Sequence, residues 1–324
     1  MSTKHLIPQP SKASPPNEGW TPEIVVSLLN AGCPNKTVKE LITSVSFSDY
    51  ESSSASDLGL KEKYGLEALP LSPEVTPLLL GTPSYPAALS YVSSAPAVLF
   101  LRGNPEALAL GVAVVGTRAP SSIAKKTVPP AVYAARLFGV PVHSGLALGV
   151  DAMAHREALD RGVLTTAVLA THPTFPSPGE NIALANEILA NNGAIVSEQL
   201  PSVTSRHPSA LVARNRIIAG LSAVIIPAEA GLRSGTMGTV ASAFELNRPV
   251  VVPVPSSHDA DLPGAKGLLA LAGLGDLGAA GLRLNEAKMD ELRARPYAAT
   301  ALASTQTELV NLVRLAYGFS PAFI

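Results

Sequence analysis

Seven short apolar runs, rich in β-branched residues, recur along the middle of the chain. They occupy residues 97–101, 112–115, 140–143, 164–169, 194–196, 223–226 and 250–254. Segments with helical spacing of apolar residues separate most of them. Apolar strands that alternate with helices are typical of a parallel sheet covered on both faces. The pattern predicts an α/β protein with a doubly wound, Rossmann-like, mostly parallel sheet from about residue 97 to residue 256.

The first part of the chain has a different pattern. Residues 1–19 carry four prolines and little apolar content, which predicts a disordered tail. Thr21 before Pro22 is typical of a helix start, and apolar residues then follow at helical spacing. Residues 20–66 are therefore interpreted as a small helical module, and the proline-rich stretch 67–96 as extended chain and turns.

Helical patterns continue beyond the predicted sheet. Residues 264–274 have the composition of an Ala/Leu/Gly helix. Residues 286–295 and 303–317 indicate two C-terminal helices that pack on the core or form a small appendage. The pattern therefore divides the chain into a tail (1–19), a helical module (20–66), a core (67–285) and C-terminal helices (286–324).

The composition and net charge limit which kinds of molecule the chain can bind. Apolar residues make up 47% of the 324 residues, charged residues 15%, and the net charge is −1, so any polyanion site is local. Cys33 is the single cysteine, which excludes an internal disulfide and fits a reducing cytosol. No apolar run approaches the ~20 residues of a membrane helix, and the N-terminal stretch lacks the apolar core of a signal peptide. We expect a soluble, cytoplasmic protein with no membrane partner.

Three predicted strand-to-helix junctions are rich in glycine and small polar residues, at 114–118, 143–151 and 231–239. The carboxyl ends of parallel strands meet at one edge of a sheet, where open α/β folds bind ligands. Arg118 lies in the first junction and Arg233 in the third. Backbone N–H groups at helix starts and guanidinium forks both bind oxyanions. The junctions therefore predict a site for a phosphorylated ligand.

The order of these segments resembles the DprA/Smf family of bacterial DNA-processing proteins. The matching segments are VAVVGTRAPS (112–121), SGLALGVDAMAHREAL (144–159), AIVSE (194–198), ARNRIIAGLS (213–222), EAGLRSGTMGT (229–239) and VVVPVPSS (250–257). Residues 82–104 also resemble the family's lead-in to its core, so the resemblance covers about residues 80–275. It implies a Rossmann-like core over 67–285, after a small helical (SAM-like) module at 20–66.

The resemblance implies a single-stranded-DNA-binding protein without enzymatic turnover. Such proteins protect incoming DNA in natural transformation, load a RecA-type recombinase and form homodimers through the Rossmann-like domain. Carried onto this chain, the contacts with the phosphate backbone fall on Gly116, Thr117, Arg118, Ser144, Gly145, Arg214, Asn215, Arg216, Arg233, Ser234 and Gly235. Backbone contact without base readout is dominated by counterion release, so we expect binding to be sensitive to salt.

Several of these arginines also have a purely structural interpretation. Arg118 could cap a helix or pair with Glu229. Arg214 and Arg216 lie two residues apart, so on a helix they point to different sides. One of them can bind DNA while the other pairs with Glu198 or Glu229, and Arg214 is the preferred DNA contact.

Other polar residues fit structural roles better. Lys125 and Lys126 are possible DNA contacts, although two adjacent lysines also fit a solvated helix end. Asp151 is interpreted as a helix N-cap and His155 as a packed or hydrogen-bonded histidine. The remaining candidates show no metal-ligand spacing, and we expect no metal, cofactor or catalytic residue; they are His143, His172, His207 and Cys33.

Two other functions remain open. Rossmann-like nucleotide sensors and nucleoside-monophosphate phosphoribohydrolases share related Gly-rich turns. A hydrolase needs a carboxylate beside the third junction, and Glu229 lies there. The extra Arg233 in that junction favours a polyanion instead. The low net basicity also leaves open a family member that serves only as a scaffold.

Overall fold

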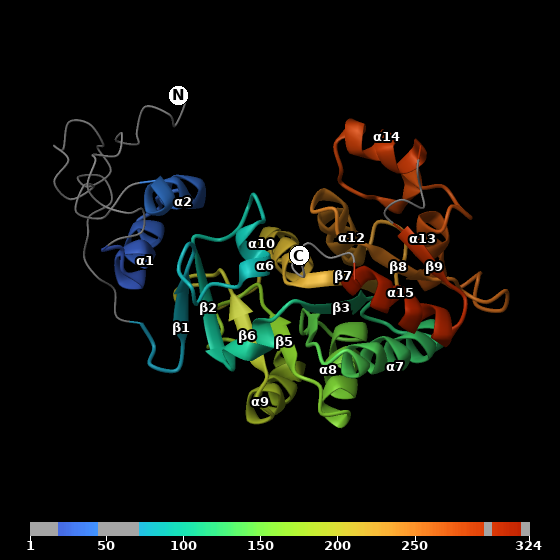
Figure 1. The fold of residues 1–324 in the computed structure, drawn as a ribbon, viewed down its shortest axis with the longest axis horizontal. Helices are drawn as coiled ribbons and strands as arrows, with labels where there is room; N and C mark the ends of the chain where they lie inside the picture. Colours follow the sequence, from blue (N-terminus) through green and yellow to red (C-terminus); the bar gives the residue numbers. More distant parts are fainter. Residues whose placement is uncertain (1–18, 45–70, 295–299, 319–324) are drawn as a thin grey trace.

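The computed structural model describes residues 19–44, 71–294 and 300–318. Within these ranges one sheet contains nine strands in the order β1-β2-β6-β5-β4-β3-β7-β8-β9 (Figure 1). The strands are β1 (Thr76–Leu79), β2 (Val98–Gly103), β3 (Gly111–Gly116), β4 (Val142–Ser144), β5 (Thr165–Val168), β6 (Ala194–Ser197), β7 (Ser222–Glu229), β8 (Val250–Pro253) and β9 (Thr300–Ala303). Seven neighbouring strands of this order, β6-β5-β4-β3-β7-β8-β9, pair in parallel. Strand β2 pairs antiparallel with β6, and β1 pairs antiparallel with β2.

The strand order reverses once, between β3 and β7. From β3 the chain adds β4, β5 and β6 on one side, and it then returns to place β7, β8 and β9 on the other side of β3. This is the doubly wound, Rossmann-like arrangement that the apolar runs predict, and each of the seven runs overlaps a strand of the sheet. The fold prediction is therefore confirmed.

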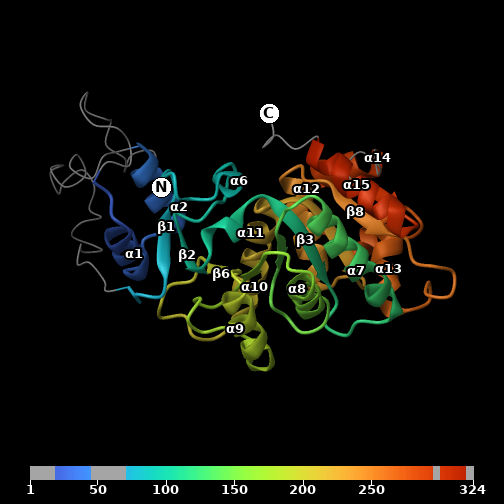
Figure 2. The same cartoon turned by 60° about the horizontal axis from the view of Figure 1, so that its bottom comes forward.

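Helices cover both faces of the sheet (Figures 1 and 2). One face carries α7 (Ser122–Leu137), α8 (Val150–Asp160) and α15 (Gln306–Gly318), and the other carries α11 (Asn215–Gly220), α12 (Gly235–Glu245) and α13 (Pro263–Leu271). Side chains alternate between the two layers along β3, as expected for a strand: Val112 and Val114 join the first layer, and Ala113 and Val115 the second. Helix α9 (Ile182–Ala190) packs beside β5 and β6.

Short helices complete the connections. They are α6 (Ala87–Ser90), α10 (Pro208–Ala213) and the 3₁₀ turns η2 (Pro105–Leu108), η3 (Gly179–Asn181) and η4 (Gly278–Ala280). The part of the chain that the structure describes contains no helix long and apolar enough to cross a membrane.

Two helices at the N-terminal end pack against the β1 edge of the sheet. They are α1 (Pro22–Asn30) and α2 (Asn35–Ser44). The Thr21 hydroxyl accepts a hydrogen bond from the Ile24 N–H at 3.4 Å, which is the predicted helix cap. The apolar faces of both helices join the core that contains β1 and β2. The predicted tail up to residue 18 and the rest of the predicted module, residues 45–66, lie outside the described residues.

The C-terminal part contains α14 (Glu286–Ala294) and α15, and between them lies β9, a strand that the sequence pattern did not indicate. Strand β9 pairs in parallel with β8 over four residues, from Val250 opposite Thr300 to Pro253 opposite Ala303. The run Thr-Ala-Leu-Ala has little β preference of its own. The partner strand therefore decides its conformation.

Candidate functional site

A cleft of about 790 Å³ lies where the strand order reverses, at the carboxyl edge of the sheet. Five segments line it: the loop after β3, the start of α8, helices α10 and α11, the start of α12, and residues 281–283. Its charged lining residues are Arg118, Asp151, Arg214, Arg233 and Arg283. Open α/β sheets bind ligands at this switch point, so the cleft is the candidate site.

The loop after β3 is fixed by backbone hydrogen bonds on both sides. The Thr117 N–H donates to the Glu229 carbonyl at 2.9 Å, and the Val150 N–H donates to the Thr117 carbonyl at 3.0 Å. Gly149 has φ +81°, and a Cβ there would collide with the Thr117 carbonyl oxygen. This close approach ties β3, β7 and α8 together and leaves the exposed Arg118 side chain in the cleft lining.

Arg214 forms the floor of the cleft, and only 9% of the residue is exposed. Its Nη1 donates to the carbonyl oxygens of Gly145 (2.8 Å) and Val168 (2.6 Å), and its Nη2 lies 3.7 Å from Asp151 Oδ2. Burial raises the pKa of the Asp151 carboxyl, and the charge of Arg214 opposes that shift. The guanidinium is therefore held rigidly by fixed oxygens, with its position set before any ligand arrives.

The second junction supports Arg214. A Cβ at Gly145 would overlap the Arg214 guanidinium, so a side chain there would displace the guanidinium from this position. The Ser144 side chain is fully buried, and its hydroxyl donates to the Val114 carbonyl at 2.7 Å. The structure therefore places Ser144 beneath the cleft, away from its surface.

The start of α12 forms another part of the cleft lining. Arg233 has a left-handed backbone (φ +55°), and Ser234 is the N-cap residue. The Ser234 Oγ is buried without a partner among the described residues. Asn215 packs against this helix, since a Cβ at Gly238 would lie 2.7 Å from its Nδ2. The N–H groups of the first helical turn and the Arg233 guanidinium both favour an anion at this end.

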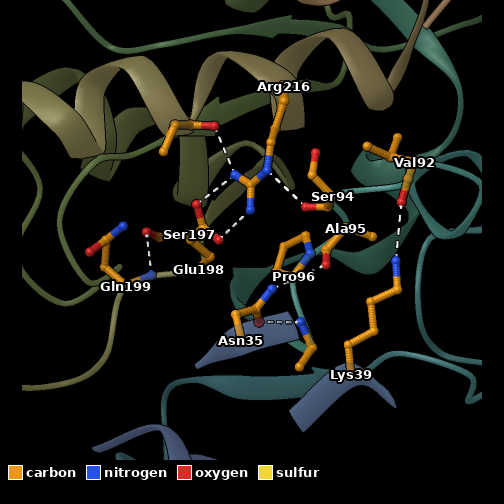
Figure 3. A network of polar contacts seen from close by, with 12 residues as sticks. Asn35, Lys39, Val92, Ser94, Ala95, Pro96, Ser197, Glu198, Gln199 and Arg216 are labelled. Atoms are coloured by element: carbon orange, nitrogen blue, oxygen red, sulfur yellow. Dashed lines mark hydrogen bonds and ion pairs between the residues drawn. The ribbon is translucent and has the colours of Figure 1, made fainter. Parts of the chain in front are cut away.

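Arg216 belongs to a different environment (Figure 3). Its Nη1 and Nη2 donate to the two carboxylate oxygens of Glu198, both at 2.6 Å, and its Nε donates to the Ser94 carbonyl at 2.8 Å. Arg216 is not among the residues that line the cleft. The interpretation that one arginine of the pair binds Glu198 is confirmed.

The same network reaches the N-terminal helices. Lys39 of α2 donates to the Ser93 carbonyl at 2.8 Å. The Asn35 amide oxygen accepts the Ala97 N–H at 2.9 Å. The loop at residues 92–97 is thereby held between α2 and Arg216, as Figure 3 shows.

Other sequence candidates take structural roles. The buried Glu229 carboxylate accepts the N–H groups of Ser121 (2.8 Å) and Ala124 (3.2 Å) at the start of α7, and no ion pair joins it to Arg118 in the described chain. Lys126 pairs with Asp259 at 2.9 Å, while its neighbour Lys125 is exposed on the same helical turn.

Two smaller predictions concern α8. His155 is buried with its Nδ1 2.7 Å from the Thr165 hydroxyl, as a packed, hydrogen-bonded histidine should be. The prediction that Asp151 is the helix N-cap is wrong. Gly149 is the cap residue, and the Asp151 carboxylate accepts the Ala147 N–H from within the first turn.

Sequence reasoning missed two arginines. Arg283 lines the cleft, and Arg206 lines a small hollow beside it together with Arg118 and Gly145. Arg206 lies in a segment without glycine, and the glycines before Arg283 do not follow a predicted strand. A lone arginine in such a segment carries no signal until the fold brings it to the site.

A doubly wound α/β fold with four arginines in its switch-point cleft defines an anion-binding protein. A family model described as DNA recombination-mediator protein A matches residues 76–272, which is more than half of the chain. The chain belongs to this family, and the resemblance seen in the sequence is confirmed.

Two curated relatives illustrate the match. Protein Smf of Escherichia coli strain K12 is 35% identical over 195 residues, which cover 56% of this chain and 48% of that protein. DNA processing protein DprA of Streptococcus pneumoniae is 39% identical over 177 residues, covering 53% and 60% respectively. The chain thus spans about half the length of the curated relatives it matches.

Solved structures share the fold. DprA from Streptococcus pneumoniae superposes with a TM-score of 0.57 at 24% identity, covering 91% of this chain and 94% of that one. DNA processing protein A from Helicobacter pylori, described for its unique single-stranded DNA binding mode, gives the same TM-score and identity over 75% of this chain and 96% of that one. At this identity the likeness establishes the architecture.

Proposed function

We propose that the chain binds single-stranded DNA in the switch-point cleft, without sequence preference and without turnover. The observation that carries the proposal is the convergence of Arg118, Arg214 and Arg233, from three separate segments, on one cleft. Guanidinium groups and helix N–H groups recognise phosphate oxygens, which every nucleotide presents alike. Among the described residues, Asp151 is the only carboxylate that lines the cleft, and its Oδ2 lies 3.7 Å from Arg214 Nη2.

The charge distribution supports a local DNA site. The chain as a whole has a net charge of −1, so long-range attraction of DNA is weak. Affinity would come from contacts inside the cleft and from the counterions that each neutralised phosphate releases. The binding constant should therefore fall steeply as salt rises.

The position of Glu229 weighs against the phosphoribohydrolase alternative. That activity needs a carboxylate at the ribosyl centre, whereas Glu229 caps α7 and is 2% exposed. A nucleotide sensor would use the same cleft, so mononucleotides belong in the test as competitors.

We further propose that the chain acts as a recombination mediator. DNA bound in the cleft would be protected and then passed to a RecA-type recombinase during transformation or recombination, with the chain working as a homodimer. The description of the matching family supports this role. The test is whether the chain increases the rate at which a RecA-type recombinase coats single-stranded DNA, together with its mass in solution by sedimentation.

The first experiment is fluorescence anisotropy of a labelled oligo-dT strand across a salt series. Wild-type protein is compared with Arg118→Ala and with a matched control, Arg136→Ala, in which the exposed arginine lies at the opposite end of α7. We expect salt-sensitive binding that Arg118→Ala weakens and Arg136→Ala leaves unchanged. No binding at low salt, or equal loss in both variants, would overturn the proposal. Displacement of the strand by a mononucleotide at low concentration would instead support the nucleotide sensor.

A further inference from the structure

One wall of the cleft comes from outside the part of the chain that the family model matches. The match ends at residue 272, at the end of α13. The chain then runs through η4 and α14 before it rejoins the sheet as β9. Among the described residues from 273 to the start of β9, three line the cleft: Gly281, Leu282 and Arg283.

The wall is docked onto the loop before α12 in a fixed register. The Arg233 N–H donates to the Ala280 carbonyl at 2.9 Å. Gly281 has a left-handed backbone (φ +77°), and a Cβ there would lie 2.8 Å from the Arg233 Cα. Ala280 and Leu282 are buried in the main core. The position of Arg283 is thereby tied to that of Arg233, a residue of the matched region.

The cations in residues 273–294 differ in whether a carboxylate pairs with them. In α14, Lys288 pairs with Glu291 at 2.9 Å, and Arg293 pairs with Glu286 and Asp290, both at 2.8 Å. Arg283 is exposed at the cleft, and no carboxylate in the described chain lies within ion-pair distance of it. Its guanidinium is therefore available to a ligand.

We propose that residues 281–283 are a DNA-binding element in which Arg283 binds a backbone phosphate of the strand that occupies the cleft. This rests on the proposed function, and it extends the site beyond the region that the family model matches. Four arginines and a single carboxylate line the cleft, so its like charges repel one another until an anion enters. A DNA strand carries several phosphates, which can contact several of these arginines at once, whereas a ligand with one phosphate cannot.

The salt dependence of binding tests the contact directly. Each phosphate contact on a single strand contributes about 0.7 to the slope of log K against log salt. Anisotropy with oligo-dT is measured across a salt series for wild type, Arg283→Ala, Arg118→Ala and a matched control, Arg293→Ala. We expect Arg283→Ala to bind more weakly at low salt, with a slope shallower by about 0.7, and Arg293→Ala to match wild type. Arg283→Lys should retain most of the slope, because the charge is kept.

The outcomes separate this inference from the function on which it rests. If wild type binds and Arg118→Ala weakens binding, while Arg283→Ala behaves like Arg293→Ala, the cleft binds DNA and the inference about Arg283 is wrong. If wild type does not bind oligo-dT even at low salt, the proposed function itself fails. Denaturant unfolding of Arg283→Ala should match wild type because the side chain is exposed, so that weaker binding reports a lost contact.

Discussion

Arg214 and Arg216 are separated by one residue, yet they belong to two regions that use a guanidinium in different ways. In the cleft, Arg214 is fixed by the carbonyl oxygens of Gly145 and Val168 and still faces the ligand space. In the network beside the N-terminal helices, Arg216 is bound by the two carboxylate oxygens of Glu198. Arg214 lies in the turn between α10 and α11, Arg216 lies in the first turn of α11, and their side chains enter different regions.

The difference shows what makes a cation available to a ligand. Carbonyl oxygens orient the Arg214 guanidinium, and Asp151 lies 3.7 Å from its Nη2. The charge of Arg214 is therefore offset less closely than that of Arg216, which binds both oxygens of Glu198 at 2.6 Å. Glu198 comes from the loop after β6, far from Arg216 in sequence, and only the fold brings the two together. The two regions can therefore be told apart by substitution: changes in the network should affect stability, and changes at the cleft surface should affect binding.

Arg214→Ala should have the largest effect, because it acts on both properties. The substitution leaves Asp151 buried without its counter-charge and removes the guanidinium donor from two carbonyl oxygens. We expect a loss of about 3–5 kcal/mol in the free energy of unfolding, together with loss of DNA binding. Denaturant unfolding and anisotropy measure the two. Wild-type stability in this variant would show that Arg214 is a ligand contact only.

Lowering the pH should reduce the free energy of unfolding through two buried histidines, His143 and His155. Burial lowers the pKa of His143 to about 4 and that of His155 to about 3, from an ordinary value of 6.5. The unfolded chain therefore takes up protons below about pH 6.5 while the folded protein does not. Stability is full above that pH and should fall by about 2–3 kcal/mol between pH 6 and pH 5.

Denaturant unfolding at a series of pH values measures this dependence. His155→Gln should make the pH dependence shallower, because it removes one of the neutral histidines that are protonated on unfolding, while His143 and His172, whose pKa burial also lowers, remain. A free energy of unfolding that is constant over this range would contradict the assignment of both histidines as neutral. The network around Arg216 in Figure 3 includes no histidine, so the pH dependence also separates the two regions.

Arg216→Ala should cost stability alone. The pair with Glu198 is partly exposed, with side-chain exposures of 18% and 15%, so we expect a loss of about 2 kcal/mol, less than for a fully buried pair. DNA affinity should stay within about twofold of wild type. A large loss of affinity at unchanged stability would mean that Arg216 reaches the ligand, and would break the distinction between the two regions.

Arg118→Ala should show the opposite behaviour with the smallest change in free energy. The side chain is exposed and lines the cleft, so unfolding should change by no more than about 0.5 kcal/mol. Affinity for oligo-dT should fall about tenfold, which corresponds to about 1.4 kcal/mol. An equal loss in the free energy of unfolding in Arg118→Ala and Arg216→Ala would show that the cleft and the Arg216 network do not differ in this way.

Most of the fold and part of the candidate site can be predicted from the sequence. Strands buried on both faces of a sheet are apolar throughout, so β2 to β8 are visible as runs. The rule that ligands bind at the carboxyl edge places Arg118 and Arg233 in one cleft. Helical geometry also separates Arg214 from Arg216, although it does not say which carboxylate each one meets. Their contacts with DNA remain predictions.

The rest depends on tertiary packing. Strand β9 forms because β8 offers an open edge, and its four residues carry no pattern of their own. Ser144 lies in a glycine-rich junction like the other candidates, but it ends β4 as a fully buried residue. Arg283 reaches the cleft through a backbone contact between Ala280 and Arg233, which no spacing rule can anticipate.

The position of the cleft between β3 and β7 also has a consequence for synthesis. Strand β3 ends at Gly116, and its neighbour β7 begins at Ser222, about 100 residues later. At a translation rate of about 5–20 residues per second, a nascent chain has one side of β3 without its partner for roughly 5–20 s. A strand from the interior of the finished sheet is thus an open, apolar edge until the ribosome has made β7. The chain is most exposed to misfolding and aggregation during this interval, before the cleft exists.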